Sequence, residues 1–333
     1  MRLLVLSGQD VHALLGYNDC AEAMRGALTA LASGRAQQPL RTVIAPDGAA
    51  GLMALMPSYL TAETGPDSDE AYGLKAICIT PANPAAGLDT HQGVVLLSSG
   101  ATGEPLALLN ASAVTEIRTA AVSVVATDLL ARPDADQLAV IGTGVQARAH
   151  ILALDGARRL SQIRVAGRDP DRVNQFVASF EGRTAAEVKA CPSAQDAVAG
   201  ASIIVTATSS AQPVLNRAWI ASGTHINAVG ACLPHQRELD TATVAAGVLF
   251  ADRRDSLLAE SGDYVLAAAE GAVTPDRIRA ELGELLLGTS PGRASADEIT
   301  IFESLGLAIE DLAAARRVYQ LAAETGAGCW TDF

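Results

Sequence analysis

The sequence contains few aromatic residues and few cations. Aromatic residues make up 4% of the 333 residues, and 24 Lys and Arg stand against 37 Asp and Glu, which gives a formal net charge of −13. Nucleic acids and anionic membrane surfaces bind basic faces, so this balance argues against both partners. Any anionic ligand must therefore be held by a few cations gathered in one place.

Cysteines are also few, and long apolar runs are absent. The five cysteines are scattered, and none forms a Cys-x-x-Cys or Cys/His cluster with the spacing of metal ligands. This predicts reduced thiols, a cytoplasmic location and no metal site. The apolar start at residues 1–7 is too short for a signal peptide and predicts a first strand. No run approaches the ~18 apolar residues of a membrane span.

The most informative stretch is a glycine motif at residues 138–150. A short apolar strand over 138–141 leads into Gly-x-Gly-x-x-Ala, and a helical pattern follows at once. Gly142 permits a tight turn, Gly144 lets the backbone approach a pyrophosphate, and the helix N-terminus favours negative charge. A plain strand–helix turn is the alternative. The predicted phosphate-binding residues are Gly142, Thr143, Gly144, Val145 and Gln146.

Around this motif, strands and helices alternate as in a doubly wound parallel sheet. The predicted strands are 138–141, 162–166, 202–206, 224–229 and 247–251, and the predicted helices are 115–131, 145–155 and 170–180. We therefore predict an α/β protein whose residues 119–310 form a Rossmann dinucleotide-binding domain.

The first third of the chain predicts an α+β arrangement with mostly antiparallel strands. The predicted elements are a helix over 11–34, a hairpin of 40–45 and 51–56, a loop over 61–70, and strands over 72–79, 93–98 and 105–109. A final helix over 305–324 is expected to return to this part. The predicted substrate domain is therefore residues 1–118, completed by the C-terminal helix and residues 311–333.

Three cations stand out because the chain is acidic, and the first of them, Arg41, lies on the predicted strand over 40–45. Lys75 lies in the middle of an apolar strand, and burying a lysine is costly unless it is paired or functional. The alternative is a lysine that faces solvent at a sheet edge. Arg118 lies on the Ala-rich helix, where the ordinary expectation is a solvated arginine paired with Glu116 or a neighbour.

Two histidines allow different interpretations. His91 stands at the start of a predicted strand, where it either transfers protons near neutral pH or serves as a hydrogen-bonded loop residue. His225 lies inside a predicted core strand and is expected to be structural.

The end of the second strand of the dinucleotide domain distinguishes NAD from NADP. An acidic residue there binds the ribose 2′-hydroxyl, whereas an arginine accepts a 2′-phosphate. This chain has Gly167 at the acidic position, followed by Arg168 and Asp169. The pattern favours NADP(H) and leaves NAD(H) possible, since Asp169 either contacts the ribose or caps the next helix.

Taken together, these residues resemble the ornithine cyclodeaminase/μ-crystallin family over nearly the whole chain. The segments that carry the resemblance are 72–79 with Lys75, 90–93, 115–121, 142–147, 204–209, 225–231, 237–240 and 302–306. One branch of this family reduces imines of 2-oxo acids, or reversibly deaminates amino acids, with NAD(P)H. The other releases ammonia from ornithine and forms proline while recycling NAD. A third possibility is a μ-crystallin-like protein that binds NADPH with little turnover.

The resemblance implies roles for particular residues. Arg41, Lys75 and Arg118 would grip the substrate carboxylate and polarise the reacting carbon, with His91 as a further proton-transfer candidate. The family also implies a homodimer formed through the sheet of the first domain and a small amino or imino acid as substrate. The remaining predicted cofactor contacts are Thr119, Thr206, Ala207, Thr208, Val229, Gly230 and Ser304.

One departure from the family pattern favours the reductase branch. Cyclodeaminases resembling this chain carry an Asp where it has Cys232, and a thiol cannot replace a carboxylate as partner of the ornithine ammonium. We therefore predict an NAD(P)H-dependent reductase of small 2-imino acids. A cyclodeaminase-type lyase and an amino-acid dehydrogenase such as an alanine dehydrogenase are the alternatives.

Overall fold

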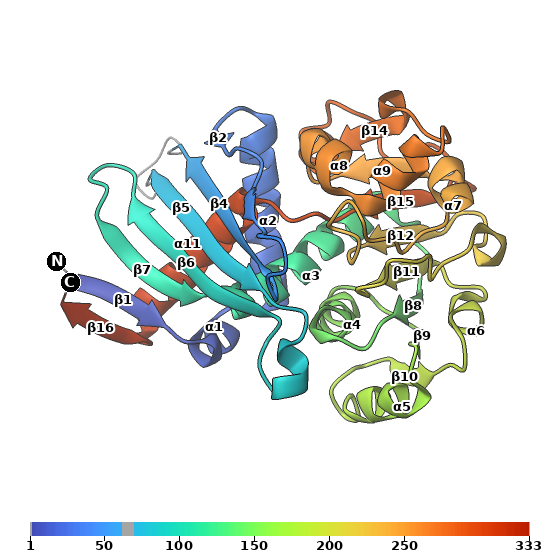
Figure 1. Cartoon of the computed structure of the whole chain (residues 1–333), viewed down its shortest axis with the longest axis horizontal. Helices are drawn as coiled ribbons and strands as arrows, with labels where there is room; N and C mark the ends of the chain where they lie inside the picture. Colours follow the sequence, from blue (N-terminus) through green and yellow to red (C-terminus); the bar gives the residue numbers. More distant parts are fainter. Residues whose placement is uncertain (1, 62–69, 333) are drawn as a thin grey trace. The chain divides into compact units, whose positions relative to one another are not determined.

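The computed structural model describes residues 2–61 and 70–332, which form two compact units (Figure 1). Unit 1 comprises Met1–Arg118 and Gly306–Phe333, and unit 2 comprises Thr119–Leu305. The chain therefore passes from unit 1 to unit 2 between residues 118 and 119, and it returns to unit 1 between residues 305 and 306. The division of roles predicted for 1–118 with 311–333 and for 119–310 stays a prediction.

Unit 1 is built on one sheet with the strand order β16-β1-β7-β6-β5-β4-β2, and β3 pairs with β4. All pairings are antiparallel except that of β1 with β7. The strands are β1 (Arg2–Leu6), β2 (Ala36–Gln37), β3 (Thr42–Ile44), β4 (Leu52–Leu60), β5 (Ala71–Ile79), β6 (His91–Ser99), β7 (Pro105–Asn110) and β16 (Cys329–Asp332). The predicted hairpin is present as β3 and β4, whereas most of the predicted loop 61–70 lies outside the described residues.

Helices cover one face of this sheet (Figure 1). The long C-terminal helix α11 (Ala308–Thr325) packs on β4, β5 and β6 and against α2 (Tyr17–Ala32). The single helix predicted over 11–34 is wrong, because α1 (Gly8–Leu14) ends at an extended Leu15 and α2 starts after an extended Gly16. A short 3-10 turn, η1 (Asn83–Ala86), joins β5 to β6.

On the other face of the sheet, no helix of the described residues covers the apolar side chains (Figure 1). Side chains alternate along each strand, so residues between the buried positions point to this face. Met53, Tyr72 and Val94 on three neighbouring strands are exposed by 37%, 49% and 42%. Exposed apolar side chains on three neighbouring strands are typical of an interaction surface.

Unit 2 is a doubly wound sheet of eight parallel strands, which confirms the predicted fold class. The order is β10-β9-β8-β11-β12-β15-β13-β14, with helices on both sides. Its strands are β8 (Gln137–Ile141), β9 (Gln162–Ala166), β10 (Glu187–Ala190), β11 (Ile203–Thr206), β12 (His225–Ala228), β13 (Val248–Ala251), β14 (Ile278–Glu281) and β15 (Thr300–Glu303). The sequence predicted five of these strands and missed β10, β14 and β15.

The helices of unit 2 begin with α3 (Ala111–Leu130), which starts in unit 1 and continues into unit 2. The others are α4 (Val145–Ala157), α5 (Pro170–Ala178), α6 (Ala194–Val198), α7 (Thr241–Ala246), α8 (Arg254–Glu260), α9 (Gly262–Ala269) and α10 (Leu282–Leu286), with 3-10 turns η2 (Arg217–Trp219) and η3 (Pro275–Arg277). In the described part of the chain, no helix combines the length and apolar character that a membrane span needs.

Candidate active site

Lys75 is buried in the middle of the unit 1 sheet. Its strand β5 lies between β4 and β6, and the residue is 3% exposed. The Lys75 Nζ lies 2.7 Å from Asp311 Oδ2 on α11, the helix that covers this face. The alternative of a solvent-facing edge lysine is therefore wrong, and the cost of burial is offset by a charged partner.

Arg118 belongs to the same buried ion network. Its Nε lies 3.1 Å from Asp311 Oδ1, and its Nη1 lies 3.0 Å from Glu310 Oε2. The expectation of a solvated helix arginine is therefore wrong. Gly306 permits this arrangement, because it has a φ of +81° and a Cβ there would lie 2.6 Å from Arg118 Nη1.

Arg41 adds a third cation near this network, and the His91 ring feels the charges of Lys75 and Arg118. Arg41 Nη2 donates a 3.2 Å hydrogen bond to the carbonyl of Gly306. His91 is the first residue of β6 and is half-buried. Burial, together with the positive charges of Lys75 and Arg118, lowers the pKa of His91 to about 4. The imidazole is therefore neutral at pH 7, which differs from the near-neutral titration that the sequence suggested.

The environment of Lys75 brings its pKa close to physiological pH. Burial, together with the charges of Arg118 and Arg41, lowers the pKa of Lys75 to about 8, although the adjacent Asp311 carboxylate opposes this shift. At pH 7 the ammonium group is still protonated, but it can give up its proton far more readily than an exposed lysine.

Sequence reasoning missed the two carboxylates of this network, Glu310 and Asp311. Both are in the first turn of α11 and are almost completely buried. An acidic pair in the first turn of a helix normally interacts with the helix dipole at the surface, so the sequence gives no signal of burial. The group contains three cations, Lys75, Arg118 and Arg41, and two carboxylates. It therefore has an excess of one positive charge, which suits an anionic ligand.

The predicted phosphate loop in unit 2 lies between β8 and α4. Gly142 has a φ of +131°, and a Cβ there would lie 2.4 Å from the carbonyl oxygen of Ala207. A Cβ at Gly144 would meet no heavy atom within 4 Å, so the space above it is open. Helix α4 begins directly after Gly144 without a side-chain cap, and Val145 is exposed by 55%. A pyrophosphate therefore fits this helix N-terminus.

The segment after β9 shows what Asp169 does. Its carboxylate accepts hydrogen bonds from the backbone N–H groups of Asp171 (3.0 Å) and Arg172 (3.3 Å), so it caps α5. Arg168 is exposed, and Gly167 is half-buried beside Thr143. Of the two interpretations of Asp169, the helix cap is thus present in the structure.

Most of the other predicted cofactor residues lie at or just after the carboxyl ends of neighbouring parallel strands in unit 2, whereas Thr119 lies on α3. Thr206 is fully buried at the end of β11, and the Val229 N–H donates to its carbonyl at 2.9 Å. Ala207, Thr208 and Gly230 are half-buried in the loops that follow. Ser304 and Thr119 are buried.

His225 and the five cysteines lie outside these groups. His225 is fully buried, and its ring nitrogens contact Thr300 Oγ1 at 2.9 Å and Asn227 Oδ1 at 3.3 Å, as expected for a structural residue. All five cysteines are free thiols. Within residues 2–61 and 70–332, no three His, Cys, Asp or Glu side chains gather to hold a metal ion.

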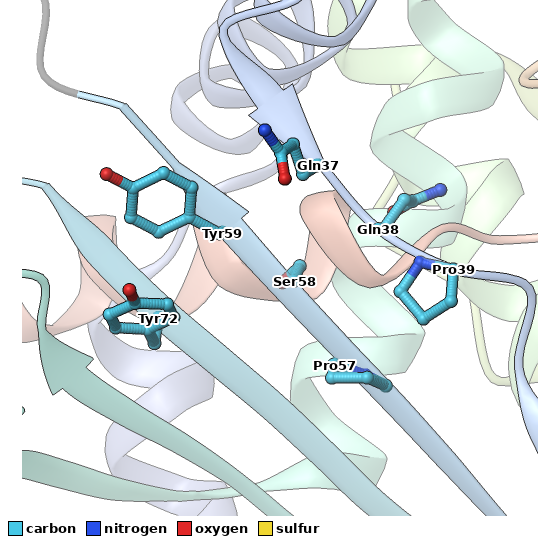
Figure 2. A pocket seen from close by; sticks show the side chains of 7 residues that line it. All are labelled: Gln37, Gln38, Pro39, Pro57, Ser58, Tyr59 and Tyr72. Carbon is cyan, nitrogen blue, oxygen red and sulfur yellow. The ribbon is translucent and has the colours of Figure 1, made fainter.

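Unit 1 also has an open pocket of about 420 Å³ near the β2 edge of its sheet. Figure 2 shows Tyr59 and Tyr72 next to each other on β4 and β5, and their ring centroids are 4.8 Å apart. The lining residues are Gln37, Gln38, Pro39, Pro57, Ser58, Tyr59 and Tyr72. None of the buried cations lines this pocket, which separates it from the Lys75 network.

Comparisons with known proteins agree with the resemblance noted in the sequence. The mouse (Mus musculus) ketimine reductase mu-crystallin is 37% identical over 286 residues, covering 86% of this chain and 85% of the mouse protein. The solved structure of Thermococcus litoralis Δ1-pyrroline-2-carboxylate reductase in complex with NADH and L-proline has a TM-score of 0.93 at 37% identity, with 99% of this chain and all of that chain covered.

An archaeal alanine dehydrogenase dimer with bound NAD has a TM-score of 0.92 at 31% identity, with both chains covered completely. The sequence pattern of the ornithine cyclodeaminase/mu-crystallin family matches residues 1–326. The predicted resemblance is confirmed, and the chain belongs to the ornithine cyclodeaminase/mu-crystallin family.

Proposed function

We propose that this chain is an NAD(P)H-dependent oxidoreductase that reduces the C=N bond of small 2-imino acids. The observation that carries the proposal is the buried Lys75, whose ammonium is held by Asp311 and whose pKa is lowered to about 8. Imine reduction needs a hydride at the carbon and a proton supply at the nitrogen, and a lysine with this pKa is suited to the proton transfer. Membership of a family with ketimine and pyrroline-2-carboxylate reductases supports the same activity.

The carboxylate of the substrate is assigned to Arg41 and Arg118. The excess of one positive charge in their group is offset when an anionic substrate binds. Arg118 is fixed by Glu310 and Asp311, so its guanidinium is positioned before the substrate arrives. Such fixed cations orient a small amino or imino acid and define where its reacting carbon lies.

Lys75 is the residue proposed to hydrogen-bond the imine nitrogen and deliver the proton. His91 is less suited to donate one, because its pKa of about 4 leaves the ring neutral at pH 7. Its proposed role is to hydrogen-bond the substrate or a water molecule as a neutral imidazole.

The cofactor proposed is NADP(H), with NAD(H) as the alternative. When bound, it would supply the hydride. Gly142, Gly144 and the N-terminus of α4 would hold its pyrophosphate, and the exposed Arg168 would bind a 2′-phosphate. The two similar solved structures contain NADH and NAD, so a preference for NADP(H) is a property proposed for this chain.

A homodimer and a cytoplasmic location complete the proposal. The exposed apolar face with Met53, Tyr72 and Val94 suits pairing with a second copy of the chain, and a similar alanine dehydrogenase is a dimer. The five free thiols suit a reducing compartment. Light scattering should therefore give twice the monomer mass of 34.2 kDa, and Val94→Glu should shift it toward the monomer.

The activity is tested by NADPH and NADH consumption with Δ1-pyrroline-2-carboxylate, with Δ1-piperideine-2-carboxylate, and with pyruvate plus amines. L-Ornithine is assayed in parallel for ammonia release. Oxidation of the reduced cofactor with an imine, and no ammonia from ornithine, supports the reductase. Ammonia and proline from ornithine without net cofactor change would mean that the argument from Cys232 is wrong and that the chain is a cyclodeaminase.

Lys75→Met tests the assigned proton donor directly. It should lower kcat/KM for the imine by at least about 100-fold, the lower range of a general acid contribution. Lys189→Met is the matched control, because Lys189 is exposed and pairs with Glu187 at the surface. A Lys75 variant within two- or threefold of the unaltered enzyme would show that the lysine has no such role.

A further inference from the structure

Three loops in unit 2 contact one another through their backbones at the carboxyl edge of the sheet. Gly142 follows β8, and a Cβ there would lie 2.4 Å from the carbonyl oxygen of Ala207, which follows β11. A Cβ at Gly230, which follows β12, would lie 2.0 Å from the carbonyl oxygen of Thr208. The three loops are therefore packed without an intervening side chain. Because their backbones lie in direct contact, we expect a displacement of one loop to move the next.

The carboxylate of Glu238 joins two of these loops. Its Oε1 accepts a 2.6 Å hydrogen bond from the N–H of Thr208, and its Oε2 accepts a 2.7 Å hydrogen bond from the N–H of Gly230. Glu238 is 0% exposed. One buried carboxylate thus fixes the spacing between the loops after β11 and β12. We call this carboxylate and its two hydrogen bonds to Thr208 and Gly230 the clamp.

The two hydrogen bonds favour the ionised form of Glu238. Both of its oxygens accept an N–H, which a carboxylate does with either oxygen, whereas a carboxylic acid keeps a proton on one of them. Burial raises the pKa of Glu238, and the hydrogen bonds with Thr208 and Gly230 oppose that rise.

Two neighbouring buried acids have raised pKa values. Burial and the charge of Glu238 raise the pKa of Asp263 to about 7. Asp263 Oδ1 also accepts the N–H groups of Glu238 (2.7 Å) and Leu239 (2.8 Å), so the backbone that carries the clamp is fixed. Burial and the charge of Asp263 likewise raise the pKa of Glu303 well above its usual range.

The position of the clamp in the sheet indicates which half of a dinucleotide it affects. The phosphate loop follows β8, and the ribose-recognising segment with Arg168 follows β9, on one side of β8. Strands β11 and β12 lie on the other side. A dinucleotide whose pyrophosphate lies on α4 therefore extends its nicotinamide half over the loops that Glu238 holds.

We propose that Glu238 is a positioning residue that fixes the loops after β11 and β12 as the support for the nicotinamide half of the cofactor. The proposal rests on the proposed dinucleotide-dependent function. It assigns Glu238 no contact with the reacting atoms. Its effect passes through Thr208 and Gly230, whose positions it sets.

Glu238→Gln is the informative substitution. Glutamine keeps the size of the side chain but presents an NH2 group to one of the two N–H donors, so one loop loses its acceptor and meets a second donor. We expect the Kd for NADH to rise at least tenfold, measured by nicotinamide fluorescence. The Kd for ADP-ribose, which lacks the nicotinamide half, should stay within twofold, measured by calorimetry. In the reductase assay, KM for NADH should rise while KM for the imine does not.

Glu298→Gln is the matched control. Glu298 also accepts from a backbone N–H, that of Ala294, and pairs with Arg279, but it precedes β15 at the amino edge of the same sheet. The same chemical change there should leave both dissociation constants unaltered. A thermal melt of both variants measures the general loss of stability separately from the ligand selectivity.

The outcomes separate the clamp from general damage and from the proposed function. Equal losses of NADH and ADP-ribose affinity in Glu238→Gln, or no loss of either, would overturn the positioning role. If Glu238→Gln does not fold, Gly230→Ala tests the same clamp from the other side and should give the same loss selective for NADH. Unaltered protein that binds neither NADH nor NADPH would refute the proposed function itself, and the clamp with it.

Discussion

Replacement of Asp311 by Asn should change the pH dependence of catalysis more than its maximum. Asp311 Oδ2 lies 2.7 Å from Lys75 Nζ, and its charge raises a lysine pKa that burial lowers to about 8. An adjacent opposite charge shifts a pKa by about one to three units, so we expect the Lys75 pKa in Asp311→Asn to fall by about two units, to about 6. At pH 7.5 the protonated fraction would then drop about 25-fold.

The measurement is kcat/KM for imine reduction between pH 5.5 and 9. In the unaltered enzyme, activity should be level at low pH and fall above a pH of about 8, as Lys75 loses its proton. In Asp311→Asn the fall should begin near pH 6, with most of the activity recovered at pH 5.5. Structural damage would not be reversed by acid in this way.

Glu310→Gln is the matched control for this experiment. Glu310 is a buried acid in the same turn of α11, and its side chain contacts Arg118 at 3.0 Å. Its loss should raise KM for the imino acid and leave the inflection near pH 8. A pH profile of Asp311→Asn that is lower at every pH but has the same inflection would refute the assignment of Lys75 as the titrating acid.

Three further substitutions test other parts of the two sites. Gly142→Ala should abolish NADH binding in fluorescence titrations and lower the melting temperature, because its φ is +131° and the carbonyl of Ala207 occupies the Cβ position. Arg168→Ala should weaken NADPH about tenfold or more and NADH by less than twofold, and equal losses would contradict the 2′-phosphate assignment. Gly306→Ala should displace Arg118 and raise KM for the imino acid at least tenfold, whereas an unchanged KM would show that the guanidinium does not bind the carboxylate.

Much of the fold could be predicted from the sequence, because its strongest patterns are local. The β9 prediction of 162–166 coincides with the observed strand, and the glycine motif lies between β8 and α4 as expected. The three strands missed in unit 2 are each four residues long, and β10 is largely exposed and polar. Such strands depend on pairing with distant neighbours and leave little alternation to detect.

The candidate site could be predicted only in part, because its ion pairs are distant in sequence. The sequence singled out Lys75 and Arg118 as cations in unusual positions, but it did not identify their partners. Arg118 and Asp311 are 193 residues apart, and no spacing rule relates them. Glu238 was noticed within a family segment without a role, because its hydrogen bonds go to backbone groups of other loops.

The return of α11 to unit 1 has a consequence for synthesis of the protein. Lys75 and Arg118 emerge from the ribosome early, whereas Glu310 and Asp311 follow only after all of Thr119–Leu305 has been made. At the ~5–20 residues per second of translation, the two cations wait about 10 to 40 s for their partners. Unit 2 is continuous in sequence and can fold during that interval. The cationic centre therefore forms last, and a chain stopped before α11 would keep its dinucleotide motif but lack the acids that stabilise the buried lysine.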